Sequence, residues 1–261
     1  MTRFDLQRFE RERAARGLSL GSTSAWPEET QSTNDDALAA AKEGAPHGAV
    51  FGAETQRRGR GRRGSEWIST PGAGLWFSVV LRPTLSPEAT PALTLCAGLA
   101  VREAAAQLVS GSVQLKWPND VLAEGRKLAG VLVESQMSGA HVGSVVVGIG
   151  INCSQTALPA PIAELATSLA LLGAPDASRE ALLASVLAAL ASRLALLERD
   201  GVSAIAAELR AHDALLGRAL RIDGQPGFGA GIDDEGRLLL RDASGQVLPQ
   251  LSGHVELLPS A

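Results

Sequence analysis

The sequence predicts an α+β protein in which helices pack on a mixed, largely antiparallel sheet, followed by a small all-β unit. Short apolar runs separated by turns follow one another from residue 113 to residue 152, which is typical of an antiparallel meander. Two segments, residues 87–109 and 178–199, carry the apolar patterns of helices, the first apolar on nearly every side and the second with apolar residues at helical spacing. After Gly217 the chain changes to short strands joined by Asp-Gly, Glu-Gly and Ser-Gly turns.

The first half of the chain alternates strand and helix patterns around one charged loop. Charged residues alternate with Phe4, Leu6 and Phe9, which indicates a short amphipathic helix near the N-terminus. The segment 87–109 is apolar on nearly every side, as expected of a buried helix. The strands expected here are residues 29–32, 49–54 and 75–81, and the helices are residues 1–16, 34–43 and 87–109.

The second half begins with the meander and ends with the β unit. Turns at Glu124-Gly125 and Ser138-Gly139 separate neighbouring strands of the meander. Leucine and valine recur at helical spacing in residues 178–199, and another helix is expected at residues 202–215. The expected strands are residues 113–116, 121–123, 128–135 and 144–152 in the meander, then 219–222, 228–232, 238–241 and 254–258 in the β unit.

A loop rich in arginine and glycine lies between two of the expected strands. Residues 56–64 contain five arginines, flanked by only two glutamates, whereas the whole chain carries a net charge of −4. Glycines let the backbone approach a ligand closely, and guanidinium groups match phosphate or carboxylate oxygens. A local positive charge on an acidic protein favours a small anionic ligand over a nucleic-acid surface.

The same loop allows two other interpretations. Its glycines spell Gly-x-Gly-x-x-Gly, the pattern of a dinucleotide-binding turn, but a Pro-Gly segment and a strand follow where that fold needs a helix. A solvated, flexible loop that binds nothing specific is the other interpretation. Two further motifs favour a ligand site: Lys-Trp-Pro-Asn-Asp at residues 116–120 and Gly-Arg-Lys-Leu-Ala-Gly at residues 125–130.

Together with Ser-Thr-Asn at residues 32–34 and Gly-Ile-Gly-Ile-Asn at residues 148–152, these motifs resemble those of biotin–protein ligases in order and spacing. The resemblance runs from Ser32 to Asn152 and continues more weakly into the C-terminal region. It implies a class II synthetase-like biotin/lipoate ligase catalytic domain and a C-terminal SH3-like β-barrel. The implied units are an N-terminal extension (residues 1–28), a catalytic biotin- and ATP-binding domain (29–216) and a small C-terminal β domain (217–261).

The reaction implied by the resemblance attaches biotin to a lysine of a biotin carboxyl carrier protein, a part of biotin-dependent carboxylases. A carboxylate is a poor electrophile towards an amine, so ATP would first convert biotin to biotinyl-5′-AMP. Bringing two anionic substrates together requires fixed positive donors and a divalent ion around the phosphoryl group. Biotin and ATP are therefore the expected substrates, and Mg²⁺ is expected to accompany ATP.

The resemblance also implies roles for individual side chains. Lys127 would bridge the biotin carboxylate and the adenylate phosphate, and Arg60 and Arg62 would lie over the same groups. Asp120 would receive or orient the acceptor lysine amine. The residues expected to bind biotin are Ser32, Thr33, Asn34, Gln56, Gly59, Arg60, Gly61, Arg62, Lys127 and Gly130. The residues expected to bind ATP or the adenylate are Arg60, Arg62, Trp67, Lys116, Asn119, Lys127 and Asn152.

Several of these residues also have ordinary structural interpretations. Ser32 and Thr33 each precede an aspartate by three residues, so either could be the N-cap of a helix. Lys127 could be a turn lysine that points to water, because lysines are mostly exposed. Trp67 could be a buried aromatic, and Asn152 could cap the end of a strand. The loop departs from the family pattern at Arg57, Arg58 and Ser65.

Composition argues against several other classes of protein. Cys96 and Cys153 lie in apolar contexts, which indicates reduced core residues, and the four histidines show no metal-ligand spacing, so we assign no metal site. No apolar run is expected to reach the length of a membrane span, and the N-terminus lacks a signal-peptide core. We therefore expect a cytoplasmic enzyme with no membrane partner.

Two rival functions deserve comparison. A lipoate or octanoate ligase or transferase of the same superfamily would share the scaffold but gives no reason for the arginine–glycine loop. A biotin-responsive repressor would need an N-terminal helix-turn-helix domain, for which the 28 residues before the catalytic domain are too few, so no specific DNA partner is expected. The sequence leaves open whether the enzyme forms a homodimer and which carboxylase carrier it serves.

Overall fold

A computed structural model of the chain describes residues 3–139, 141–160 and 162–258. Its larger part is a seven-stranded sheet in the order β1-β3-β5-β9-β8-β7-β6. Only β1 and β3 run parallel among the neighbours of this sheet, so the predicted mixed, largely antiparallel architecture is confirmed. The strands are β1 (Ser24–Ala25), β3 (Val50–Ala53), β5 (Gly74–Leu81), β6 (Val113–Lys116), β7 (Asp120–Ala123), β8 (Arg126–Ser138) and β9 (His141–Asn152), beside a separate pair, β2 (Glu29–Thr30) and β4 (Thr55–Gln56).

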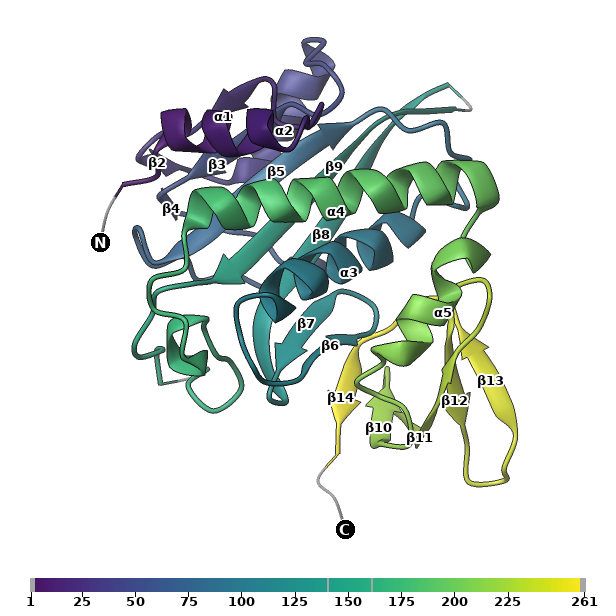
Figure 1. Cartoon of the computed structure of the whole chain (residues 1–261). Helices are drawn as coiled ribbons and strands as arrows, with labels where there is room; N and C mark the ends of the chain where they lie inside the picture. The colour runs from purple at the N-terminus through teal and green to yellow at the C-terminus, as the bar shows by residue number, and fades with distance from the viewer. Residues whose placement is uncertain (1–2, 140, 161, 259–261) are drawn as a thin grey trace.

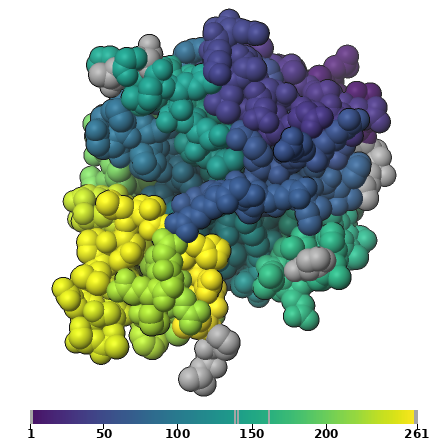
Figure 2. All heavy atoms as spheres, turned by 180° about the vertical axis from the view of Figure 1, so that it is seen from behind, coloured from purple at the N-terminus to yellow at the C-terminus, as the bar shows by residue number. Residues whose placement is uncertain are grey.

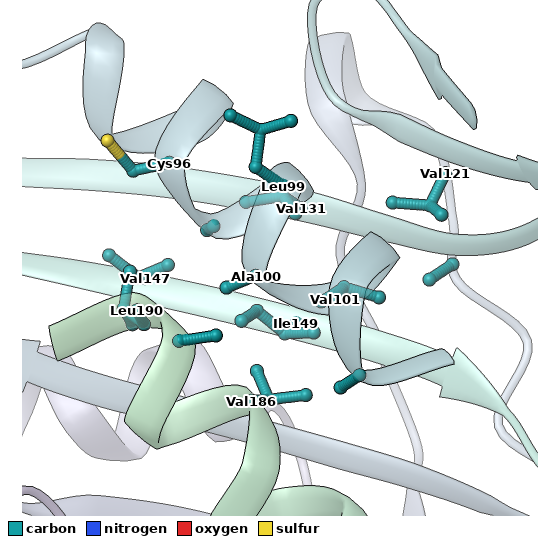
Figure 3. Close-up of a cluster of buried hydrophobic side chains, with 14 of the residues drawn as sticks. Cys96, Leu99, Ala100, Val101, Val121, Val131, Val147, Ile149, Val186 and Leu190 are labelled. Carbon is teal, nitrogen blue, oxygen red and sulfur yellow. The ribbon is translucent and has the colours of Figure 1, made fainter. Parts of the chain in front are cut away.

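Helices cover the two faces of the main sheet (Figure 1). On one face, α3 (Ala92–Ala106) and α4 (Arg179–Asp200) pack against each other and against the strands. Their apolar side chains meet Val147 and Ile149 of β9 in a continuous core (Figure 3). Because strand side chains alternate between faces, the residues of β9 that alternate with these, such as Val146, point away from this core. They face the side of the sheet on which α2 (Thr33–Lys42) packs over a second, smaller core.

The N-terminal segment packs onto the same body. The predicted helix is confirmed as α1 (Leu6–Ala15), which lies against α4, although residues 1 and 2 of the predicted range lie outside the described residues. Phe4 stacks on Trp26 with ring centroids 3.7 Å apart. Buried Glu54 accepts the Phe4 N–H at 2.6 Å and forms an ion pair with Arg179 at 2.8 Å. These contacts fix the start of the chain against the sheet and α4.

The structure corrects three expectations about the elements. The helix predicted for residues 87–109 begins only at Ala92, because the residues between Pro87 and Pro91 form turns. The short strands β1, β4 and β13 were missed, since runs of two to four residues carry little periodic signal. Helix α4 is 22 residues long and apolar enough to span a membrane by length and composition, contrary to the expectation. Most of its apolar stretch is buried against the protein, so α4 is a core helix.

A five-stranded antiparallel sheet forms the C-terminal unit, in the order β13-β12-β11-β10-β14, and confirms the predicted small all-β unit. It follows α5 (Ser203–Ala211) and contacts the main sheet. Leu115 of β6 exchanges backbone hydrogen bonds with His212 and Ala214, and Trp117 donates its Nε1–H to the Gly236 carbonyl at 3.0 Å. The strands are β10 (Ala219–Ile222), β11 (Gln225–Ile232), β12 (Leu238–Arg241), β13 (Val247–Gln250) and β14 (Val255–Leu257); residues 259–261 of the predicted domain lie outside the described residues.

Candidate active site

A pocket of about 490 Å³ opens on the sheet face opposite α3 and α4. The middle of β8 and β9 forms its floor, the start of α2 and the arginine–glycine loop form its sides, and Gly253 and His254 of the C-terminal unit form one edge. Figure 2 shows this side, with the loop (blue) crossing the teal strands towards the yellow C-terminal unit. The predicted site residues that line it are Ser32, Thr33, Asn34, Gln56, Arg60, Gly61, Arg62, Trp67, Asn119, Asp120, Lys127 and Gly130.

Glycines of β9 let two other elements approach the pocket floor. Gly148 and Gly150 face the pocket, whereas Ile149 between them points into the core on the other face. A Cβ at Gly148 would lie 1.9 Å from Asn34 Oδ1, and a Cβ at Gly150 would lie 2.6 Å from the Trp67 ring. Any larger residue would therefore displace the start of α2 or the end of the loop.

A chain of hydrogen bonds orders the α2 side of the pocket. The backbone N–H and the hydroxyl of Thr33 donate to Gln56 Oε1 at 2.9 and 3.1 Å. Ser78, fully buried in β5, places its Oγ 2.9 Å from Thr33 Oγ1 and 2.6 Å from Asn34 Oδ1. The Asn34 side-chain amide donates to Glu134 Oε2 at 2.7 Å. Three predicted ligand-binding side chains are thus held in a defined orientation by neighbours.

Ser32 occupies the N-cap of α2, so that part of the structural interpretation is confirmed. Its side chain makes no capping hydrogen bond, however, and the expected capping-box pairing is wrong. The two aspartates of the first turn have other partners: Asp36 accepts the Thr30 hydroxyl at 2.6 Å, and Asp35 pairs with Arg60 at 2.9 Å. The Ser32 side chain therefore lines the pocket without capping the helix.

Two arginines of the loop are held by carboxylates on different parts of the molecule. Arg60 makes a bidentate contact with Glu134 of β8, at 3.0 and 2.6 Å, in addition to its ion pair with Asp35. Arg63 makes a bidentate contact with Asp223 of the C-terminal unit, at 2.5 and 3.0 Å. Both guanidinium groups therefore have carboxylate partners in the absence of a ligand, and the expected contact of Arg60 with biotin and the adenylate stays a prediction.

Arg62, between them, has a different environment. Its Nη1 donates to the neutral side-chain oxygen of Asn119 at 3.0 Å. Burial lowers the pKa of Arg62, and the neighbouring Arg63 lowers it further, although an arginine remains charged in proteins. Desolvation of a charge is unfavourable unless a partner compensates for it. A ligand anion in this pocket would therefore compensate the buried charge of Arg62 more than the charges of Arg60 and Arg63, which already pair with carboxylates.

Lys127 and Asp120 form an ion pair between adjacent strands, with Nζ and Oδ1 2.7 Å apart. Asn119 donates its amide to the same Asp120 oxygen at 3.1 Å. The Lys127 ammonium also lies 5.3 Å from the Trp67 ring centroid, within cation–π range. The Lys127 side chain is therefore held over the pocket floor rather than pointing to bulk water from a turn.

Three predicted site residues do not line the pocket. Gly59 accepts the Trp67 N–H at 2.8 Å and shapes the loop from its base. Asn152 donates its side-chain amide to the Thr167 carbonyl at 2.9 Å, which matches the alternative of a strand-end contact. Lys116 is half-buried, and burial lowers the pKa of its ammonium.

Ser78, Glu134 and His254 line or support the pocket and were not among the predicted site residues. Ser78 did leave a signal, because it is one polar residue within an apolar strand, and such a residue needs buried partners. Glu134 and His254 belong to no motif. Only the three-dimensional pairing of β8 with the loop, and of the two sheets, brings them to the site.

Comparisons with known proteins give a consistent picture. The Biotin/lipoate A/B protein ligase family matches residues 26–152. The biotin–[acetyl-CoA-carboxylase] ligase of Mycobacterium tuberculosis is 38% identical over 94% of this chain and 94% of its own. The bifunctional ligase/repressor BirA of Bacillus subtilis is 34% identical over 82% of this chain and 68% of its own. The structure of the Aquifex aeolicus biotin protein ligase in complex with biotin and ATP aligns with a TM-score of 0.79 at 29% identity, covering 92% of this chain and 100% of that one.

Proposed function

This chain belongs to the biotin/lipoate A/B protein ligase family, and we infer that it is an ATP-dependent biotin–protein ligase. The observation that carries this function is the convergence of Arg62, Lys127 and Asp120 on one glycine-floored pocket. Two cations and one carboxylate at one site suit a reaction that joins two anions and then admits an amine. Ser32, Thr33, Asn34 and Gln56 would hold biotin at the α2 end.

Biotin recognition would use the polar groups beside α2. A ureido ring offers two N–H donors and one carbonyl acceptor. The Ser32 side chain is not engaged as a helix cap, and the Gln56 amide adds donor and acceptor atoms on the facing strand. Because Thr33 and Gln56 already bond to each other, little side-chain freedom would be lost on binding.

In the first step, a carboxylate oxygen of biotin would attack the α-phosphorus of ATP. The new P–O bond forms as pyrophosphate leaves with the electrons of the broken bond. We propose that Lys127 and Arg62 lie on the two anionic groups and stabilise the charge that develops between them. Lys127 would exchange its ion pair with Asp120 for the substrate oxygens. ATP would bring Mg²⁺ with it, and Trp67, Lys116, Asn119 and Asn152 remain proposed adenylate contacts.

In the second step, the lysine amine of a biotin carboxyl carrier protein would attack the acyl carbon of biotinyl-5′-AMP. An amide bond forms and AMP departs. The attacking amine must be neutral, so a carboxylate that orients it and accepts its proton assists the step. Asp120 is placed for this role once Lys127 has turned to the phosphate, because the two side chains share one edge of the pocket. We place this reaction in the cytoplasm.

An intact-mass experiment on a carrier domain tests the function. The carrier would be incubated with enzyme, ATP, Mg²⁺ and either biotin or lipoate. We expect a mass increase of one biotinyl group with biotin, none without ATP, and none on a carrier whose acceptor lysine is replaced by arginine. A mass increase with lipoate alone would instead support the rival lipoate ligase.

A further inference from the structure

We propose that Arg63 and Asp223 form a positioning pair that ties the arginine–glycine loop to the C-terminal unit and so holds Arg62 in the pocket. The effect of this ion pair on catalysis rests on the proposed function. Its role in holding the loop against the C-terminal unit does not. Asp223 lies in the turn between β10 and β11, 160 residues beyond Arg63. The loop leads into β5 of the main sheet, whereas the turn joins two strands of the C-terminal sheet.

The pair has a specific geometry. Arg63 Nη1 and Nη2 contact Asp223 Oδ1 and Oδ2 at 2.5 and 3.0 Å, a two-point contact that also fixes orientation. Arg63 has φ of 54°, a conformation that residues other than glycine rarely adopt. Asp223 and Gly224 both have positive φ in a two-residue hairpin turn. The Arg63 contact, chiefly its hydrogen bond, lowers the pKa of Asp223 to about 2, so the pair is ionised near neutral pH.

Asp223 also shapes the pocket edge on its own side. Its Oδ1 accepts the backbone N–H of His254 at 3.0 Å. Gly253 and His254 are the residues that the C-terminal unit contributes to the pocket lining. One carboxylate therefore holds both the loop and the facing edge of the pocket. Loss of the Asp223 carboxylate should therefore increase the mobility of both the loop and the pocket edge formed by Gly253 and His254.

The loop has a second anchor on the other side of Arg62. Arg60 is fastened to Glu134 and Asp35 on the main sheet and α2. Arg62 lies between these two anchors, and its charge faces the pocket. Glycines on either side make this segment entropically unfavourable to order, so fastening both ends before ligand binding removes part of that cost.

A neighbouring ion pair provides a matched control. Arg57 and Glu29 lie 2.5 Å apart with side chains 62% and 42% exposed, close to the 53% and 46% of Arg63 and Asp223. Exposed pairs of this kind contribute little to global stability. The control pair joins two residues of the main domain, whereas the proposed pair joins two units. A difference between their variants would therefore report positioning rather than loss of a surface charge.

Hydrogen exchange of the ligand-free protein tests the tie without any substrate. The amides of Gly61, Ser65 and Trp67 bond within the loop and report its opening. In Asp223→Asn and Arg63→Gln, we expect these amides to exchange roughly fivefold faster, with Arg63→Lys intermediate because it keeps only a single point of contact. Glu29→Gln should leave exchange unchanged. Exchange as slow in both tie variants as in the unmodified protein would overturn the proposal.

The rate at which the protein releases chemically prepared biotinyl-5′-AMP tests whether the ion pair holds Arg62 in the pocket. Asp223→Asn and Arg63→Gln should each release it roughly fivefold faster, and the double variant should be no worse than either single one. Unchanged release, or losses that multiply in the double variant, would overturn the positioning role. Unfolding midpoints of all variants should match, which separates this effect from misfolding. A protein that never biotinylates a carrier would refute the proposed function, yet faster loop exchange would still support the tie.

Discussion

At the scale of single residues, the partner of each charged side chain helps to distinguish its role. The sequence motifs alone do not separate these roles. Arg60 and Arg63 face carboxylates, Arg62 faces a neutral amide, and Lys127 faces Asp120. These four cations of the site motifs therefore differ in how readily they could bind a substrate anion. In our proposal, the developing negative charge of the reaction lies against Arg62 and Lys127, whose partners in the pocket a substrate could replace.

The role of Lys127 can be separated from substrate binding by mutation. Lys127→Ala should slow adenylate formation by about 10²- to 10³-fold, equivalent to ~3–4 kcal/mol in the barrier, because a charge-assisted donor is lost. Biotin affinity should fall much less, since Ser32, Thr33 and Gln56 remain. Lys127→Arg should rescue poorly, as a planar fork replaces a compact ammonium. Rates of pyrophosphate release and calorimetric biotin titrations would measure the two effects.

Supplying biotinyl-5′-AMP to Lys127→Ala provides the control, because it bypasses the first step. Transfer to the carrier should then be largely restored. If transfer remains as slow as the complete reaction, Lys127 acts in the second step or supports the fold, and its assignment to adenylation is wrong.

The buried carboxylate of Asp213, away from the pocket, should make the stability of the protein depend on pH. Burial raises the pKa of Asp213, whose Oδ2 has no partner among the described residues, while Oδ1 accepts the Leu215 N–H at 2.8 Å. The folded state then binds the proton more tightly than the unfolded state. Its contribution to stability is present below the unfolded pKa and is lost as pH rises through the folded pKa. In urea unfolding, this contribution to the free energy of unfolding should decline between about pH 4 and pH 7, and Asp213→Asn should remove the decline.

Asp242→Asn is the opposite-sign control for that experiment. Hydrogen bonds, first among them that of the Ser244 side chain, lower the pKa of Asp242. Its contribution to stability is therefore present above the unfolded pKa and is lost as pH falls. The difference in unfolding free energy between unmodified protein and variant should change with pH in opposite directions for the two substitutions. Parallel curves would contradict the assignment of Asp213.

At the scale of elements, the sequence predicts those strands and helices whose bounds are set by local periodicity and turn residues. The ends of β6, β10 and β12 agree with residues 113–116, 219–222 and 238–241. The two-residue strands and the late start of α3 follow from tertiary contacts and from prolines, which periodicity does not describe. The site motifs likewise name residues that line the pocket, among them Arg62, Asp120 and Lys127. They do not name Glu134, which reaches the site only because β8 passes beneath the loop.

The glycines of β9 give a prediction about an element rather than a charge. Gly148→Ala would place its Cβ 1.9 Å from Asn34 Oδ1 and displace that side chain from Ser78 and Glu134. Biotin affinity should fall by about 10- to 100-fold, which corresponds to losing one or two polar contacts of ~1–1.5 kcal/mol each. Isothermal titration with biotin measures the loss directly.

Ile149→Val is the control on the same strand, because its side chain faces α3 and α4. It should lower the free energy of unfolding by about 1 kcal/mol and leave biotin affinity unchanged. Equal affinity losses in both variants would show that β9 distortion, rather than the glycine floor, controls binding.

At the scale of the whole molecule, the large core and the proposed active site lie on opposite faces of one sheet. The large core, with α1, α3 and α4, lies on one face, and the pocket lies on the other. The C-terminal unit contacts the end of the main sheet through Trp117 and reaches the pocket through His254. Substitutions on the core face should therefore change stability with little direct effect on the chemistry.

The buried ion pair between Glu54 and Arg179 tests this division. Glu54→Ala would leave the Arg179 charge buried without that carboxylate and would remove the acceptor of the Phe4 N–H. Breaking one side of a buried pair typically costs ~3–5 kcal/mol, so urea unfolding should show a loss of this size. The turnover of the folded fraction at low temperature should nevertheless stay close to normal, because neither side chain lines the pocket. Asp200→Asn, which breaks an exposed pair at the other end of α4, should change neither quantity. Turnover that falls in proportion to stability would mean that the N-terminal contacts position the pocket as well as hold the fold.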